Sequence, residues 1–351
     1  MASSHKKAVF SKQLLQQPDD FPLYVDFDAL QVAFVGMNRE DYLASVFLDD
    51  RVHRSSDRIV SVELKKVLGF CERYYSSQCS ANYLFHTAYC CSTLLSRLLD
   101  RPRETLVYRE PIVLTQLAMA SRDPSIALDA SMLKRSIRAL HFLLSRSYGE
   151  EVPVIKPSDS CNNIIAELMG ASKNSRALLM YSSLQSFILS NLKSPERRNF
   201  LFTQFLQRAK MDAASIACLS SINTETLSAG QSAAFVWLVQ MLHSEKAIVR
   251  APKSIYSMDA DSFLSCPERA LHKINALFGL GFDDASLADI LQADAFRKHS
   301  KNAGTDYGIE QRADEKEKLA AEWAGDIKEG VAWVESIGVF GVGQVLSNAL
   351  L

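Results

Sequence analysis

ANYLFHTAYCCSTLLSRLL, residues 81–99, passes from an apolar run to a short polar turn and then to a helical period, and this order predicts the fold of the chain. The apolar run Tyr83–Phe85 predicts a buried strand, and the segment that begins with Ser92 and Thr93 has the period of a helix. A short turn of small and polar residues separates the two. A strand, a tight turn and a helix N-terminus in this order present backbone N–H groups and a helix dipole to an anion. The stretch therefore predicts a phosphate-binding turn in a nucleotide-handling protein.

Short apolar runs and helical periods alternate along the rest of the chain. Three more strands are predicted with the first, at 105–108, 152–155 and 177–181, and late strands at 247–250 and 254–256. Helical periods cover 112–121, 131–148, 184–192, 197–211, 231–243 and 267–277. Four strands, each followed by a helix, predict an α/β fold. We expect a parallel sheet flanked by helices on both faces, with a helix-rich C-terminal half.

The first part of the chain has a different pattern. Residues 1–20 are polar, 39–48 has a helical period, and 59–70 mixes strand and helix signals. We therefore expect residues 1–75 to form an N-terminal extension packed on a main α/β domain over 76–351.

Composition excludes several classes of protein. The chain has 351 residues, 48% of them apolar, and a formal net charge of −1, which gives no reason to expect nucleic acid as a partner. Its seven cysteines are scattered and show no zinc-ligand spacing, so we expect free thiols and no metal. No apolar run approaches the roughly 18 residues that a membrane helix needs. A cytoplasmic protein without a membrane partner is expected.

The turn lacks the Gly and Lys of a Walker loop. Residues 88–95 instead resemble the 5′-phosphosulfate loop of P-loop sulfotransferases, with Tyr89 where that family has a basic residue and Cys91 where it has glycine. Ser92, Thr93, Leu94 and Leu95 match the family pattern. The resemblance implies a P-loop sulfotransferase-like fold that binds 3′-phosphoadenosine 5′-phosphosulfate without a metal. The residues that it assigns to this donor are Thr87, Ala88, Tyr89, Cys90, Cys91, Ser92 and Thr93.

Two charged residues follow other predicted strands, at the sheet edge where ligands of parallel sheets bind. Glu110 precedes Pro111, and this segment resembles the catalytic-base segment of carbohydrate-type sulfotransferases. Glu110 is predicted to be either a general base for a hydroxyl acceptor or a carboxylate at a helix start. Lys156 ends the strand 152–155 and is either the replacement for the missing loop cation or a surface lysine.

The resemblance assigns three further residues to the donor. Ser190 matches a serine that binds the 3′-phosphate in the family, and Ser182 stands where the family has arginine. Arg197 and Arg198 lie close by in the sequence and are candidates to replace that arginine. Lys301 belongs to a basic segment that resembles the loop closing over the donor.

Three functions remain open at this point. The first is a sulfotransferase-like enzyme with a hydroxyl acceptor, in which Glu110 and Lys156 are catalytic. The second is a nucleotide- or phosphate-binding protein of the same fold without transfer chemistry. The third is a kinase-like phosphoryl transferase, for which the sequence lacks the Walker lysine and its Ser or Thr. The acceptor and the oligomeric state are not determined by the sequence.

Overall fold

The computed structural model describes residues 18–75, 79–126, 128–293, 298–299, 302–306, 318–338 and 343–351. The chain divides into two compact units. Unit 1 comprises residues 1–83, 100–161 and 167–175, and unit 2 comprises 84–99, 162–166 and 176–351. The predicted boundary between residues 75 and 76 stays a prediction.

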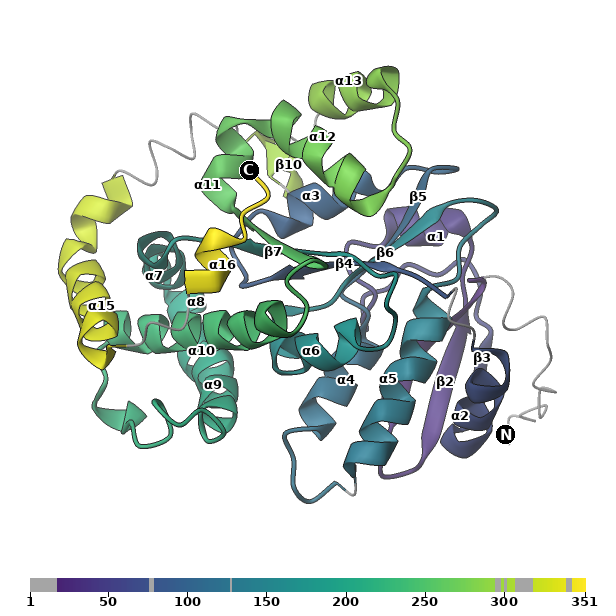
Figure 1. The fold of residues 1–351 in the computed structure, drawn as a ribbon, viewed down its shortest axis with the longest axis horizontal. Helices are drawn as coiled ribbons and strands as arrows, with labels where there is room; N and C mark the ends of the chain where they lie inside the picture. Colours follow the sequence, from purple (N-terminus) through teal and green to yellow (C-terminus); the bar gives the residue numbers. More distant parts are fainter. Residues whose placement is uncertain are drawn as a thin grey trace. The chain divides into compact units, whose positions relative to one another are not determined.

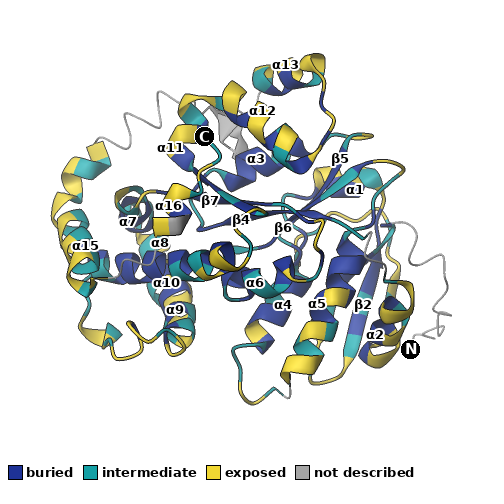
Figure 2. Cartoon of the chain, viewed as in Figure 1, coloured by how far each residue is buried: buried dark blue, intermediate teal, exposed yellow. Residues whose placement is uncertain are grey.

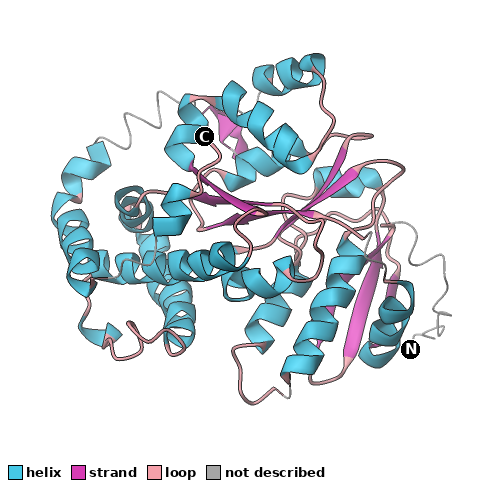
Figure 3. Ribbon diagram, in the orientation of Figure 1, coloured by secondary structure: helices cyan, strands magenta, loops and turns pink. Residues whose placement is uncertain are grey.

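The fold is α/β, with a five-stranded parallel sheet in the order β5-β6-β4-β7-β8, and the predicted fold class is confirmed (Figure 3). Its strands β4, β5 and β7 are buried along their whole length, because a parallel sheet covered on both faces leaves no polar side. The strands are β4 (Asn82–His86), β5 (Thr105–Arg109), β6 (Val152–Lys156), β7 (Ala177–Tyr181) and β8 (Ile255–Asp259).

Unit 1 adds an antiparallel sheet of the order β1-β2-β3. Helix α4 packs against β1, and α2 packs against α5. The ambiguous segment 59–70 contains a strand followed directly by a helix, since β3 ends at Glu63 and α2 begins at Leu64. The elements are β1 (Asp20–Asp26), β2 (Gln31–Gly36), α1 (Arg39–Ala44), β3 (Ile59–Glu63), α2 (Leu64–Tyr74), α4 (Ile112–Ala120) and α5 (Ala130–Leu144).

Unit 2 is built around the long helix α10 (Ala229–Arg250), which contacts α7, α9, α15 and α16 and is buried along much of its length (Figure 2). Figure 1 shows α3, α11 and α12 on one side of β7 and β8 and α10 on the other. The helices are α3 (Ser92–Leu99), α7 (Leu184–Leu192), α8 (Pro195–Phe200), α9 (Leu206–Ala213), α11 (Ala260–Ser265), α12 (Pro267–Phe278), α13 (Asp284–Gln292), α15 (Ala324–Ile337) and α16 (Gly343–Ser347).

The remaining described elements are short. A π-turn η3 (Leu201–Phe205) joins α8 to α9. A 3-10 turn η2 (Asp159–Ile164) precedes α6 (Ile165–Met169), and a second 3-10 turn η4 (Thr224–Thr226) lies before α10. Strands β9 (Lys298–His299) and β10 (Asn302–Asp306) form an antiparallel pair. Within the described ranges, no helix combines the length and the apolar composition that crossing a bilayer requires.

Two element predictions were wrong. Residues 247–250 form the last turn of α10 instead of a strand. Ala247 and Ile248 are buried while Val249 is 62% exposed, which is helical periodicity that a short apolar run does not reveal. The predicted helix over 39–48 ends at Ala44, because the following segment pairs with β5: the Leu48 N–H donates to the Arg109 carbonyl at 2.7 Å.

Candidate functional site

Three residues in the turn between β4 and α3 have a left-handed backbone conformation, with positive φ. Ala88, Tyr89 and Cys91 have φ values of 64°, 51° and 61°. This region is unfavourable for side chains with a Cβ, so the surrounding structure must hold the turn in place. Cys91, where the resemblance predicts glycine, has a positive φ, a conformation that glycine adopts with less strain than any other residue. The turn therefore keeps a glycine-like path without a glycine.

Ser182 holds this turn against the end of β7. Its N–H lies 3.4 Å from Thr87 Oγ1, and its hydroxyl donates to the Tyr89 carbonyl at 3.0 Å. Trp237 Nε1 in turn donates to the Ser182 carbonyl at 2.9 Å. Ser182 is only 2% exposed and braces the loop backbone through these two contacts.

The first turn of α3 carries the two predicted hydroxyl residues. Ser92 and Thr93 are 5% and 7% exposed, and the next two residues, Leu94 and Leu95, are buried as well. The Leu95 N–H closes the first helical hydrogen bond with the Cys91 carbonyl at 3.0 Å. N–H groups at such a helix start, together with its dipole, favour an anion. Direct contact of Ser92, Thr93, Cys90 and the other loop residues with a donor stays a prediction.

Two more sequence-predicted residues, Arg197 and Ser190, contact one another beside the ring of Tyr89. The Arg197 guanidinium carbon lies 4.5 Å from the centre of this ring, and Arg197 Nη1 donates to the Ser190 carbonyl at 2.9 Å. Ser190 thus contributes a backbone oxygen here. Lys301, the last residue that the sequence predicts to bind the sulfuryl donor, lies outside the described residues.

Glu110 and Lys156 form an ion pair in unit 1. The parallel register pairs Arg109 with Lys156 at the ends of β5 and β6, which places Glu110 beside that lysine. Glu110 leaves the strand in a left-handed conformation, with φ of 50°, and its N–H donates to the Lys156 carbonyl at 2.6 Å. The Lys156 side chain is fully buried, whereas that of Glu110 is 22% exposed. A partly exposed carboxylate held by a buried ammonium can accept a proton from a bound hydroxyl.

Sequence reasoning missed two neighbours of this pair, Phe47 and Arg51. The Phe47 ring centre lies 6.0 Å from Lys156 Nζ and 4.8 Å from the Arg51 guanidinium carbon. The hydrogen bonds that Arg51 donates to the Asp49 carboxylate raise the pKa of Arg51, and the negative charge of Glu110 adds to this shift. The sequence predicts a helix over 39–48, so it does not indicate that Phe47 lies next to Lys156. That position depends on the pairing of Leu48 with β5, which is a long-range contact.

A buried ionic network fixes the end of β5 just before Glu110. Arg109 Nη1 lies 2.6 Å from Asp100 Oδ2, and Arg39 Nη2 lies 2.7 Å from Asp100 Oδ1. Arg39 Nε also meets Glu151 Oε1 at 2.9 Å. These contacts hold the backbone that presents Glu110.

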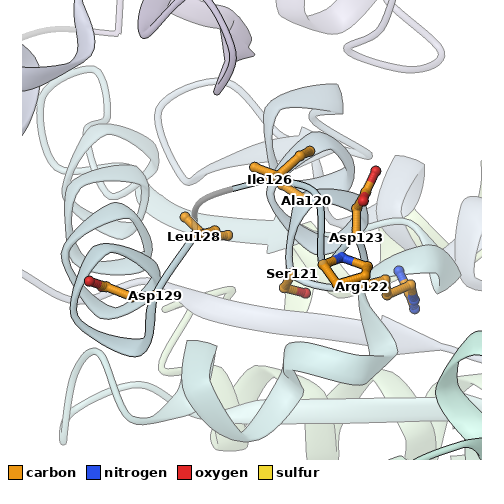
Figure 4. Close-up of a pocket in the computed structure, with 8 residues that line it drawn as sticks. Ala120, Ser121, Arg122, Asp123, Ile126, Leu128 and Asp129 are labelled. Atoms are coloured by element: carbon orange, nitrogen blue, oxygen red, sulfur yellow. The ribbon is translucent and has the colours of Figure 1, made fainter.

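A hollow of about 460 Å³ lies elsewhere in unit 1, between the end of α4 and the start of α5 (Figure 4). None of the sequence-predicted site residues lines it, so it is not the candidate site. The residues around it are Ala120, Ser121, Arg122, Asp123, Pro124, Ile126, Leu128 and Asp129. Among the described residues, no group of three or more His, Cys, Asp or Glu side chains is placed to hold a metal ion.

Six chains among the solved structures are similar to this chain. No family model matches the chain, and no curated protein matches it. A sulfotransferase domain from the curacin biosynthetic pathway is similar over 70% of this chain and 97% of that domain, with 12% identity and a TM-score of 0.35. A score at this level supports neither a shared fold nor a shared activity.

Proposed function

We propose that the chain is a sulfotransferase-like enzyme that transfers a sulfuryl group from 3′-phosphoadenosine 5′-phosphosulfate to a hydroxyl acceptor. The observation that carries the proposal is the Glu110–Lys156 ion pair at the ends of adjacent parallel strands. The carboxyl ends of such strands are where α/β sheets bind ligands. The left-handed turn before α3 is a second supporting observation, because a turn at a helix start in unit 2 suits a phosphate group of the donor.

In the proposed reaction, Glu110 removes the proton of the acceptor hydroxyl while its oxygen attacks the donor sulfur. The new bond is between that oxygen and sulfur, and the bond between sulfur and the bridging phosphate oxygen breaks. Adenosine 3′,5′-bisphosphate leaves with the bonding electron pair. The positive charge of Lys156 is matched by Glu110 until this proton transfer and is then no longer offset by the carboxylate.

Replacement of Glu110 by glutamine tests this proposal. Glu110→Gln keeps the size of the side chain and removes the base, so turnover is expected to fall by roughly 10²–10⁴ with nearly unchanged donor affinity. Release of adenosine 3′,5′-bisphosphate in the presence of phenol, alcohol and sugar acceptors measures turnover, and calorimetry measures affinity. Glu104→Gln, which alters the ion pair with Arg101 at the other end of β5, is the matched control.

Equal losses of affinity and turnover in Glu110→Gln would instead indicate a structural role for this carboxylate. A wild-type protein that binds the nucleotide but transfers nothing would favour the second candidate, a nucleotide- or phosphate-binding protein. That candidate is supported by the turn before α3, which has Tyr89 and Cys91 in place of a basic residue and a glycine and is braced by Ser182. Thermal shifts with adenosine 3′,5′-bisphosphate, ATP and GTP distinguish a sulfate donor from the donor of a kinase-like transferase.

A further inference from the structure

We propose that Arg197, held against the ring of Tyr89, is the cation that binds a phosphate group of the donor at the turn 87–93. This inference rests on the proposed function and identifies a binding residue for its donor. The turn itself contains no Lys or Arg between Thr87 and Leu95. A phosphate bound there therefore needs positive charge from another part of the chain.

The contacts of Tyr89 show how that charge reaches the turn. The side chain of Tyr89 lies with its ring centre 6.3 Å from Phe187 and 6.0 Å from Phe205. Its backbone is held by the Ser182 hydroxyl, which donates to the Tyr89 carbonyl at 3.0 Å. The ring thus has a defined position, and its face meets the Arg197 guanidinium at 4.5 Å. An aromatic face attracts a guanidinium without neutralising its charge.

The remaining contacts of Arg197 leave most of its donors for a ligand. Arg197 is half-buried on α8, and its Nη1 donates to the Ser190 carbonyl at 2.9 Å. A guanidinium has five N–H donors in a planar fork that suits phosphate. Among the described residues, no carboxylate pairs with Arg197. Its positive charge is therefore not neutralised within the described part of the chain.

Two other cations, Arg198 and Lys156, are less suitable than Arg197 for binding a phosphate at the turn 87–93. Arg198, the next residue on α8, lies over the Trp323 ring at 4.6 Å, and its Nη2 lies 3.5 Å from the Leu192 carbonyl. It therefore stacks on an aromatic ring that does not belong to the turn. Lys156 lies in unit 1, where its charge is matched by Glu110. Arg197 alone among these three contacts a side chain of the turn.

Calorimetric titration of the full chain with adenosine 3′,5′-bisphosphate tests the inference. Arg197→Gln should weaken binding roughly 10- to 100-fold, the range for losing hydrogen bonds between charged partners. Arg197→Lys should lose less, because it keeps the charge without the planar fork. Arg198→Gln is the matched control, since it removes a neighbouring arginine that is also stacked on an aromatic ring, and its affinity should stay within about twofold of wild type.

We infer that Tyr89 positions Arg197, so the nucleotide affinities of Tyr89 variants provide a second test. Tyr89→Phe keeps the aromatic face and should retain affinity, whereas Tyr89→Leu removes the face and should weaken binding several-fold. The salt dependence of the dissociation constant should be reduced in Arg197→Gln, which a purely structural defect would not produce.

The outcomes separate the inference from the proposed function. Wild-type binding with unchanged affinity in Arg197→Gln, or an equal loss in Arg198→Gln, overturns the inference and leaves the proposed function standing. A wild-type protein that does not bind adenosine 3′,5′-bisphosphate overturns both. If Arg197→Gln fails to fold, as judged by circular dichroism, equal affinities of Tyr89→Phe and Tyr89→Leu overturn the inference, and the expected difference supports it.

Discussion

At the scale of single residues, His141 shows how burial sets a titration. Its Nδ1 lies 2.8 Å from the Tyr83 hydroxyl, and its Nε2 lies 3.4 Å from the Cys79 carbonyl. Burial lowers the pKa of His141 to about 4, although the contact with the Cys79 carbonyl opposes part of the shift. The folded protein therefore keeps this imidazole neutral over a range in which the unfolded chain protonates it.

This difference predicts a loss of stability in acid. Between pH 6.5, the ordinary pKa of histidine, and about pH 4, the unfolded state binds a proton that the folded state does not. The free energy of unfolding should therefore fall as pH decreases through this window, by about 3 kcal/mol in total from this residue. Urea unfolding at several pH values should show a weaker pH dependence in His141→Gln than in wild type. Identical slopes in the two proteins would contradict the assignment.

At the scale of elements, the crossing of α10 and α15 depends on two glycines. A Cβ on Gly230 would lie 2.1 Å from the Asp326 carbonyl oxygen, and one on Gly330 would lie 2.7 Å from the Gly230 carbonyl oxygen. Distances of this kind allow no side chain unless the helices move apart. The small residues therefore set how closely α15 approaches α10.

Gly230→Ala is expected to destabilise the protein by roughly 1–3 kcal/mol, because overpacking forces a backbone shift. Thermal and urea unfolding measure the change. Gly69→Ala on α2 is the control, since nothing lies within 4 Å of the added Cβ. There the alanine should stabilise the helix by roughly 0.5–1 kcal/mol. A stable Gly230→Ala protein would show that the α10–α15 crossing adapts without cost.

At the scale of the whole molecule, the Asp100 network connects segments distant in the sequence. Asp100 accepts from Arg39 on α1 and Arg109 on β5, and both its carboxylate oxygens are used. Arg109 Nε also donates to the Ser45 carbonyl at 3.0 Å. The network joins the N-terminal segment to the strand that presents Glu110 and stabilises unit 1.

Asp100→Ala should cost about 3–5 kcal/mol, because it removes the carboxylate that Arg39 and Arg109 share, and both guanidinium groups are largely buried. The midpoint of urea unfolding measures the loss. Glu104→Ala removes the partner of Arg101 in a partly exposed pair and should change stability by at most about 1 kcal/mol. Similar small effects in both variants would mean that Arg39 and Arg109 find other partners when Asp100 is removed.

Much of the fold was predictable because its signals are local. The apolar runs at 83–85, 105–108, 152–155 and 177–181 lie within β4, β5, β6 and β7, and their burial in a parallel sheet makes them continuous rather than alternating. The predictions failed where a distant partner acts on the backbone. Residues after Ala44 leave the helix because Leu48 pairs with Arg109, a contact that no local period reveals.

By itself, the sequence determined the strand, turn and helix around 81–99 and the α/β alternation, since side-chain periodicity and apolar runs follow from neighbouring residues. Only the tertiary structure decided which polar residues meet. The register of β5 and β6 places Glu110 in an ion pair with Lys156, and the packing of α8 brings the Arg197 guanidinium over the Tyr89 ring. Strand order and helix packing join residues far apart in the chain, and their energy depends on long-range contacts that sequence spacing does not encode.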